Sequence, residues 1–212
     1  MWDSGRGRRR AAGWNGGCEN GDTAQAQGGT GGLWRTRQLD FQIHAIDAAI
    51  WLLGQRPVAA MGGSRICRPD PHGDSRDVLS VVFEYADGLV HEHFGQALPN
   101  RTKGELSCKA YSVGAHAYIN YWGESSYEKR GKPAAARPVE DLYKAGANRN
   151  IAAFYQAVTT GQYENATVAR AVDGSLTAIL GREAADRHGH LTMDQLLREN
   201  RRVEPDLTGL KV

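Results

Sequence analysis

Four residues that can take part in chemistry recur at helical spacing. Asp40, His44, Asp47 and Trp51 are separated by 4, 3 and 4 positions, so they share one face of a helix that turns by about 100° per residue. A carboxylate one turn from an imidazole can fix its tautomer and raise its pKa from about 6.5. The pattern therefore indicates a general acid/base that works near neutral pH. Spacing alone favours a plainer alternative, in which the acids complement the helix dipole and the histidine lies on the surface.

A second candidate is the pair His91 and His93, with Glu92 between them. Alternate residues of a strand point to the same side, so the two imidazoles would share one face. Such a pair can ligate a transition metal if a third ligand arrives from elsewhere. The sequence identifies no such ligand, although His72, Asp74 or His116 can be suggested, and ordinary strand positions are the favoured interpretation. We therefore expect no metal site.

Other catalytic signatures are missing from the sequence. Cys18, Cys67 and Cys108 are odd in number and far apart, so neither a disulfide framework nor a CxxC zinc site is indicated. Cys67 and Cys108 are expected to be buried small residues rather than nucleophiles. Neither glycine run, at residues 5–10 or 29–34, has the third glycine or the preceding strand that a dinucleotide-binding turn needs.

Hydrophobic spacing predicts the helix that carries the first candidate site. Its apolar face recurs at helical spacing and consists of Leu39, Ile43, Ile46, Ile50 and Leu53. Gly54 follows at the position where helices end, and Pro57 comes three residues later, as is typical of a helix C-terminus. We expect a helix of about four turns over residues 39–53.

Strands and further helices are predicted along the rest of the chain. Residues 78–85 and 89–97 flank the turn Ala86-Asp87-Gly88, which predicts a hairpin. Further strands are expected at 105–112 and 116–122, and a loop at 123–138. Helices follow, and Thr192 with Gln195 predicts a capping box that opens the last one. The order predicts an α+β fold, with a mainly antiparallel open sheet and helices packed on one face. In the helical part, the residues at helical spacing are Ile151, Phe154, Tyr155 and Val158, closed by Gly161, and then Val168, Val172, Ile179 and Leu180, interrupted by Gly174.

Composition excludes several classes of protein and separates a tail from the domain. The formal net charge of the 212 residues is +2, which is unlike the basic footprint of a nucleic-acid-binding domain. No run of about 18 apolar residues exists, as a membrane-spanning helix would need.

Ten of the 26 glycines fall in the first 32 residues, where no hydrophobic period exists, so we expect residues 1–30 to form a disordered, solvated tail. The arginine run at 6–10 is followed by no apolar segment, so we expect no secretory signal and a cytoplasmic location.

Two stretches of sequence resemble a known family, the Gfo/Idh/MocA oxidoreductases. The resemblance covers residues 31–212 and is to the C-terminal domain of these enzymes. The C-terminal end of the chain is most similar to the bacterial branch of the family. The more specific motif is a D-x-x-x-H-x-x-D stripe followed by W-L-x-G-x-x-P. The matching segments are Gly31-Gly32-Leu33-Trp34, residues 39–47, residues 51–57, Asn150-Ile151 with Phe154 and Gly161, residues 175–185, Leu191-Thr192 and residues 206–211.

The resemblance implies an NAD(P)-dependent oxidoreductase that acts on a sugar or polyol. In this family a dinucleotide domain holds NAD or NADP, and an α+β domain supplies the substrate wall and an oligomer-forming sheet. Carried over by motif position, His44 would be the general acid/base, and Asp40 would orient it and hydrogen-bond the substrate. Asp47 and Trp34 would contact the substrate, although Asp47 is equally well interpreted as structural.

The sequence also departs from this family. Only 39 residues precede Asp40, whereas one βαβ unit takes about 30 residues and a dinucleotide domain needs two βαβαβ halves. The family's catalytic lysine, which precedes the Asp/His helix, has no counterpart. We therefore expect the chain to be the substrate and oligomerisation half of such an enzyme, inactive without a separate dinucleotide (Rossmann) domain. The alternative is a non-catalytic binding or assembly module that retains the fold, and a metal hydrolase built on His91 and His93 is a distant third.

Overall fold

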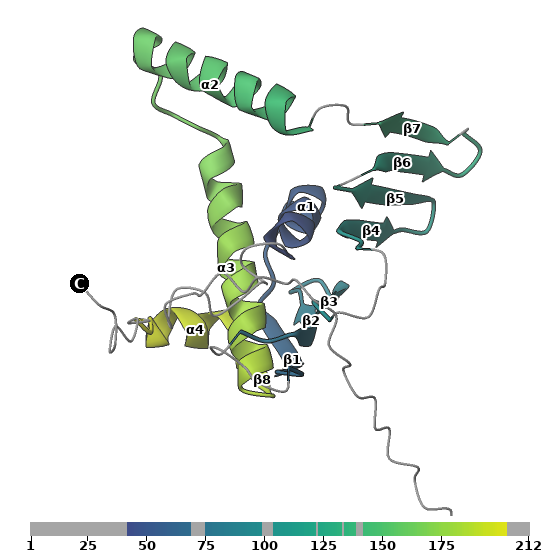
Figure 1. Ribbon diagram of the computed structural model, residues 1–212, viewed down its shortest axis with the longest axis vertical. Coiled ribbons are helices and arrows are strands. Elements are labelled where there is room, and N and C mark those ends of the chain that lie inside the picture. The colour runs from purple at the N-terminus through teal and green to yellow at the C-terminus, as the bar shows by residue number, and fades with distance from the viewer. Residues whose placement is uncertain are drawn as a thin grey trace, which may run out of the picture.

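The chain folds into two antiparallel sheets and a group of helices. The computed structural model describes residues 42–68, 75–98, 104–121, 123–132, 134–138 and 142–202. Sheet A has the strand order β3-β2-β1-β8, and sheet B has the order β4-β5-β6-β7 (Figure 1). This is the α+β fold that the order of elements predicts. The elements are α1 (Ile43–Leu53), β1 (Ala59–Arg65), β2 (Val78–Glu84), β3 (Val90–Gln96), β4 (Ser107–Tyr111), β5 (Ala115–Asn120), β6 (Glu124–Lys129), β7 (Ala135–Pro138), α2 (Leu142–Thr160), α3 (Thr167–Asp186), β8 (His190–Thr192) and α4 (Met193–Glu199).

The main hydrophobic core lies between sheet A and α3. Alternate residues of β2 are buried, among them Val81 and Phe83, and they pack with Leu180 and Ala184 of α3. Helix α3 contacts β1, β2 and β8, and α1 in turn packs on α3. Burial of these apolar side chains is the main source of stability for the fold. Helix α3, with α1 packed on it, thus covers one face of sheet A, as the α+β prediction implies.

Helix α1 ends where the sequence predicts. Gly54 adopts the left-handed conformation with φ +69°, and its N–H donates to the Ile50 carbonyl oxygen at 2.9 Å. Glycine takes this conformation without strain, which is why it terminates helices so often. Ile46 and Ile50 are fully buried against Ala178 of α3. The apolar face of α1 is therefore fixed on α3, and the candidate residues His44, Asp47 and Trp51 lie beside that face.

One glycine explains why the apolar spacing of α3 is interrupted. A Cβ atom at Gly174 would lie 2.9 Å from the Asp47 Oδ1 atom and 3.8 Å from the Asp47 Cα atom. The missing side chain thus lets α1 approach α3 closely, and the Asp47 carboxylate fills the space. The interruption at Gly174 is a packing feature of the α1–α3 contact.

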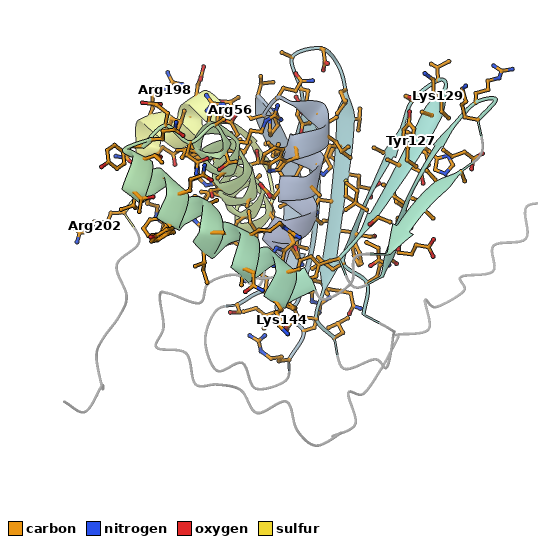
Figure 2. The ribbon with its side chains drawn as sticks, turned by 90° about the horizontal axis from the view of Figure 1, so that it is seen from above. Arg56, Tyr127, Lys129, Lys144, Arg198 and Arg202 are labelled. Carbon is orange, nitrogen blue, oxygen red and sulfur yellow. The ribbon has the colours of Figure 1, made fainter. Side chains whose placement is uncertain are left out.

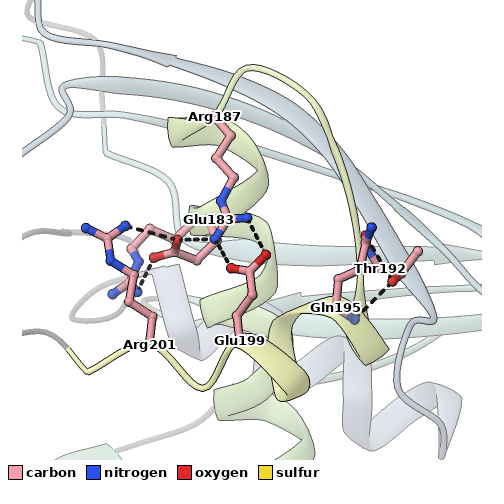
Figure 3. Close-up of polar contacts among 7 residues, drawn as sticks. Glu183, Arg187, Thr192, Gln195, Glu199 and Arg201 are labelled. Carbon is pink, nitrogen blue, oxygen red and sulfur yellow. Dashed lines mark hydrogen bonds and ion pairs between the residues drawn. The ribbon is translucent and has the colours of Figure 1, made fainter.

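Helix α4 is attached to α3 by a cluster of ion pairs (Figure 3). The buried Glu183 carboxylate accepts from Arg182 at 2.7 Å and from Arg187 at 3.1 Å, and Arg187 also pairs with Glu199 of α4 at 2.6 Å. Burial acts to raise the pKa of Glu183, but the hydrogen bonds from Arg182 and Arg187 outweigh it and lower the pKa. The capping box of Thr192 and Gln195 is confirmed at the start of α4.

One expectation about the strands is wrong, and one strand was not predicted. Residues 123–138 form β6 and β7 rather than a loop, joined by a turn in which Gly131 has φ +76°. Their side chains are mostly polar or small because β6 and β7 lie at the outer side of sheet B (Figure 1), so pairing with β5 is needed to define them. Strand β1 was also not predicted, although it is central in sheet A. Its small residues are required there, because a Cβ at Gly62 would lie 2.5 Å from the Ser80 carbonyl oxygen.

Some expectations cannot be compared with the structure. The predicted tail at residues 1–30, and the start of the predicted helix at 39–41, lie outside the described residues. Within the described part of the chain, the helices are too short or too polar to cross a membrane.

A pair of matched glycine substitutions tests the α1–α3 contact. We expect Gly174→Ala to lower the free energy of unfolding by about 1 kcal/mol, because overpacking costs roughly 1–3 kcal/mol and the better helix propensity of alanine returns only about 1 kcal/mol. Gly146→Ala in α2 should instead stabilise the protein, since a Cβ there meets no atom within 4 Å. Denaturant unfolding of both variants measures the difference. If Gly174→Ala were as stable as Gly146→Ala, α1 would not pack on α3 as described.

Candidate functional site

An aromatic stack defines the surroundings of His44. The exposed imidazole lies on the ring of Tyr121, with ring centroids 4.4 Å apart and an interplanar angle of 23°. Tyr121 directly follows β5, and its hydroxyl donates to the Tyr143 hydroxyl at 3.2 Å. Tyr143 belongs to the first turn of α2, and its ring stands at 80° to that of Tyr121. The site therefore joins α1, sheet B and α2.

Figure 2 shows how the start of α2 lies relative to sheet B. Lys144, the residue after Tyr143, lies at the beginning of α2, whereas Tyr127 and Lys129 lie toward the outer end of sheet B. The end of β5 and the start of α2 thus provide the side chains around His44, whereas Tyr127 and Lys129 of β6 lie away from them.

Asp47 and Trp51 continue the stripe along α1, on its α3 side. Asp47 is half-buried, and burial raises its pKa although the charge of His44 and a hydrogen bond from Trp51 both act to lower it. The Arg170 guanidinium of α3 lies 5.1 Å from the centre of the Trp51 ring and donates to the Trp51 carbonyl oxygen at 3.3 Å. A cation over an aromatic face is a favourable contact. The stripe predicted for His44, Asp47 and Trp51 is present, with Asp47 and Trp51 engaged by α3.

The beginning of α1 rests on strand β3. Gln42, directly before α1, accepts a hydrogen bond from His93 Nε2 through its Oε1 atom at 2.9 Å. This assigns the proton of the neutral His93 to Nε2, because the amide oxygen is only an acceptor. The Gln42 amide lies against Gly95, where a side-chain atom would overlap it. Gln42, His93 and Gly95 together fix the start of the helix that carries His44.

Of the two histidines of β3, His93 is buried and His91 is partly buried, and each has a polar partner. His91 Nδ1 lies 3.3 Å from the Tyr85 hydroxyl, and the two imidazole centroids are 6.5 Å apart. Burial lowers the pKa of His91 to about 4, and burial together with the neighbouring His91 lowers that of His93 to about 4. Both are therefore neutral at physiological pH.

No metal-binding group is found in the part of the chain that the structure describes: none of its His, Cys, Asp and Glu side chains form a set of three that could hold an ion. His116, one of the suggested third ligands, lies on β5 in sheet B and faces Glu128 at 3.9 Å. His72 and Asp74 lie outside the described residues.

The described cysteines are partly covered. Cys67 and Cys108 are both intermediate in exposure, rather than fully buried as expected. Burial raises the pKa of the Cys108 thiol. A raised pKa disfavours the thiolate, so Cys108 is a poor nucleophile.

The sequence identified only part of this site. His44 and Asp47 are described, whereas Asp40 and Trp34 lie outside the described residues and their roles remain predictions. Spacing gave no indication of Tyr121 or Tyr143, because they reach His44 from other elements. The one available signal was the Asn120-Tyr121-Trp122 run at the end of a predicted strand, where a polar aromatic side chain can face a ligand.

The arrangement suits proton transfer beside an aromatic surface. An exposed imidazole can accept or donate a proton at its ring edge while one of its faces is covered by Tyr121. The described strands pair only in antiparallel fashion, so this part of the chain contains no βαβ unit to hold a dinucleotide. The described residues thus fit a proton-transfer and substrate site and do not fit a nicotinamide cofactor.

Comparisons with known proteins identify this fold in sugar dehydrogenases. No protein-family model matches the sequence, and no curated protein matches it. Among solved structures, the apo form of levoglucosan dehydrogenase matches with a TM-score of 0.60 and 15% identity over 80% of this chain and 56% of that chain. UDP-N-acetylglucosamine 3-dehydrogenase GnnA from Acidithiobacillus ferrooxidans matches with a TM-score of 0.54 and 14% identity over 69% and 46%. GenD2 from gentamicin A biosynthesis, in complex with NAD, matches with a TM-score of 0.53 and 19% identity over 72% and 46%.

These similar structures are oxidoreductases of the Gfo/Idh/MocA type. Levoglucosan dehydrogenase is also known in complex with NADH and levoglucosan. The chain spans about half the length of each of these proteins. At such low identity the likeness establishes the fold, and activity remains to be proposed.

The buried histidines predict how stability depends on pH. The pKa of His93 falls from 6.5 to about 4 on folding, so the unfolded chain binds the proton more tightly than the folded chain. The free energy of unfolding is therefore unaffected above pH 6.5 and decreases as the pH falls toward 4. For His93, with 7% exposure, the loss is roughly 3 kcal/mol. We expect His93→Gln to flatten the decline in unfolding free energy between pH 7 and pH 4.5.

The control for this measurement is His116→Gln, which changes an exposed histidine of β5. It should leave the pH dependence unchanged. A decline of equal slope in the wild type and His93→Gln would show that His93 is not buried as described.

Proposed function

We propose that the chain provides the substrate-binding and oligomer-forming part of an NAD(P)-dependent oxidoreductase that acts on a sugar or polyol. The observation that carries this proposal is the exposed His44 imidazole, held against Tyr121 at the start of α1. It occurs on a fold shared with about half of the levoglucosan dehydrogenase chain. By motif position, the resemblance to the Gfo/Idh/MocA oxidoreductases implies that the same histidine is the general acid/base.

In the proposed reaction His44 handles the proton of the reacting hydroxyl. Oxidation of a carbinol removes a hydride from carbon and a proton from oxygen, and neutral His44 accepts that proton at a ring nitrogen. Asp40, one turn earlier, orients the imidazole and hydrogen-bonds the substrate. Asp47 and Trp34 contact the substrate in the same proposal, although the packing of Asp47 against Gly174 also favours a structural role.

The hydride acceptor has to be bound by another domain. The described part of the chain has only antiparallel strand pairs and therefore no dinucleotide fold. NAD or NADP would be held by a Rossmann domain, and the chain alone would not transfer hydride. Helix α2 offers a surface for such a domain, because apolar residues at helical spacing are left exposed: Ile151, Phe154, Tyr155 and Val158.

The outer face of sheet A favours self-association as a second function. On the side away from α3, Met61, Val90 and Phe94 expose 52%, 75% and 61% of their surface. Several exposed apolar residues on one face of a sheet are typical of a protein interface. We propose that a second copy of the chain covers this face, which is also what a purely non-catalytic assembly module would do.

Replacing His44 tests the catalytic proposal. The chain is fused to the dinucleotide half of levoglucosan dehydrogenase, and NADH formation is followed with a panel of sugars. We expect the fusion to form NADH and His44→Ala to lose roughly a hundredfold or more in kcat, because general acid/base groups contribute about 10²–10⁴. His116→Ala removes a histidine remote from the site and should retain activity.

Calorimetry with NADH on the unfused chain completes this test. Tight NADH binding by the chain alone would contradict the proposed division into two domains. Full activity of His44→Ala in the fusion would exclude His44 as the acid/base.

A charge on the outer face of sheet A tests the oligomer. Phe94→Glu should shift the chain toward monomer at micromolar concentration, because burying an unpaired carboxylate is costly. Tyr111→Glu, at an exposed position of β4, serves as the control and should leave the assembly unchanged. Light scattering measures both. If the wild type were already monomeric, the proposed contact would be wrong.

A further inference from the structure

Tyr121 and Tyr143 form an angled aromatic surface beside His44. Their ring centroids are 6.1 Å apart and the rings are nearly perpendicular, at 80°. The Tyr121 ring is stacked on the imidazole at an interplanar angle of 23° and covers one of its faces. The Tyr143 ring is 72% exposed, so most of its surface faces solvent next to the site. We refer to these two residues as the tyrosine pair.

The position of the imidazole restricts how a substrate can approach. The nitrogen atoms of an imidazole donate and accept hydrogen bonds in the plane of the ring. Because Tyr121 covers one face of His44, a hydroxyl group has to approach from the edge of the imidazole. The rest of the ligand then lies alongside the stack, within reach of the second, upright tyrosine ring.

The hydroxyl pair fixes the orientation of both rings. Tyr121 donates to the Tyr143 oxygen at 3.2 Å, and this hydrogen bond raises the pKa of Tyr121. Because the Tyr121 hydroxyl is the donor in this hydrogen bond, the Tyr143 hydroxyl can still donate a hydrogen bond to a ligand. The pair thus combines an apolar ring face with a directed polar group. This is the combination that small-molecule sites use for affinity and orientation.

We propose that the tyrosine pair is the sugar-ring subsite of the candidate active site. The apolar C–H face of a cyclic sugar packs on the Tyr143 ring, and one ring hydroxyl meets His44 at the edge of the imidazole. This inference rests on the proposed function and assigns Tyr121 and Tyr143 as the residues that select a cyclic substrate over an open-chain polyol. An open-chain polyol has no extended C–H face to place on an aromatic ring.

Sugar binding to the full chain tests this subsite. Saturation-transfer NMR titrations are made with methyl β-D-glucopyranoside and myo-inositol as cyclic probes and with D-sorbitol as the open-chain probe. We expect at least one cyclic probe to bind the wild type more tightly than D-sorbitol. Tyr143→Leu should weaken that binding by about fivefold or more, and Tyr143→Phe by less because it keeps the aromatic ring.

A matched control lies just beyond the same helix. Tyr163, three residues after the end of α2, is 79% exposed, against 72% for Tyr143, and Tyr163→Leu should leave sugar binding unchanged. The chemical shift of the His44 ring protons reports whether the stack on Tyr121 persists in each variant, which separates loss of the subsite from misfolding. Equal binding by Tyr143→Leu and the wild type would overturn the proposal, as would preference for D-sorbitol or no binding of any probe.

The outcome is separable from that of the proposed function. Normal sugar binding by Tyr143→Leu, together with an inactive His44→Ala fusion, would reject the subsite and retain the oxidoreductase. Sugar binding that depends on Tyr143, together with a fully active His44→Ala fusion, would retain the subsite and reject the catalytic role of His44.

Discussion

The close contact of α1 with α3 at Gly174 determines where the candidate site lies. Because Gly174 has no side chain, the Asp47 carboxylate takes that space, and Ile46 and Ile50 reach Ala178. Helix α3 is itself fixed on sheet A by residues such as Leu180 and Ala184. The main core therefore fixes the position of His44 through α3. The contact of Gln42 with β3 fixes the start of α1 independently. A side chain placed by close-packed neighbours keeps a defined geometry even though it is exposed.

The helices of this protein were predictable because each has its own local signals. The apolar spacing of α1 and the glycine after it predict its face and its end, and Thr192 with Gln195 predict the start of α4. The strands were less predictable from the sequence. Strand β1 is rich in small residues that are needed for close packing against β2, and the polar strand β6 is defined by its pairing with β5. Neither leaves an alternating pattern in the sequence.

The same distinction applies to the site. Spacing within one helix indicated His44 and Asp47, since both lie on α1. Tyr121 and Tyr143 come from the end of β5 and the start of α2, and only the fold brings them to the imidazole. Sequence reasoning locates groups that share an element, whereas groups that meet across elements emerge from tertiary packing.

The contact between Gln42 and Gly95 has a consequence for how this sequence can vary. Any side chain at position 95 would overlap the Gln42 amide, and that amide also satisfies the buried His93. A larger residue at 95 therefore requires the Gln42 side chain to move away or to be replaced by a shorter one, and either change would leave His93 Nε2 in need of another acceptor. We expect positions 42, 93 and 95 to covary among related sequences, so that a relative that differs at one of them also differs at the other two.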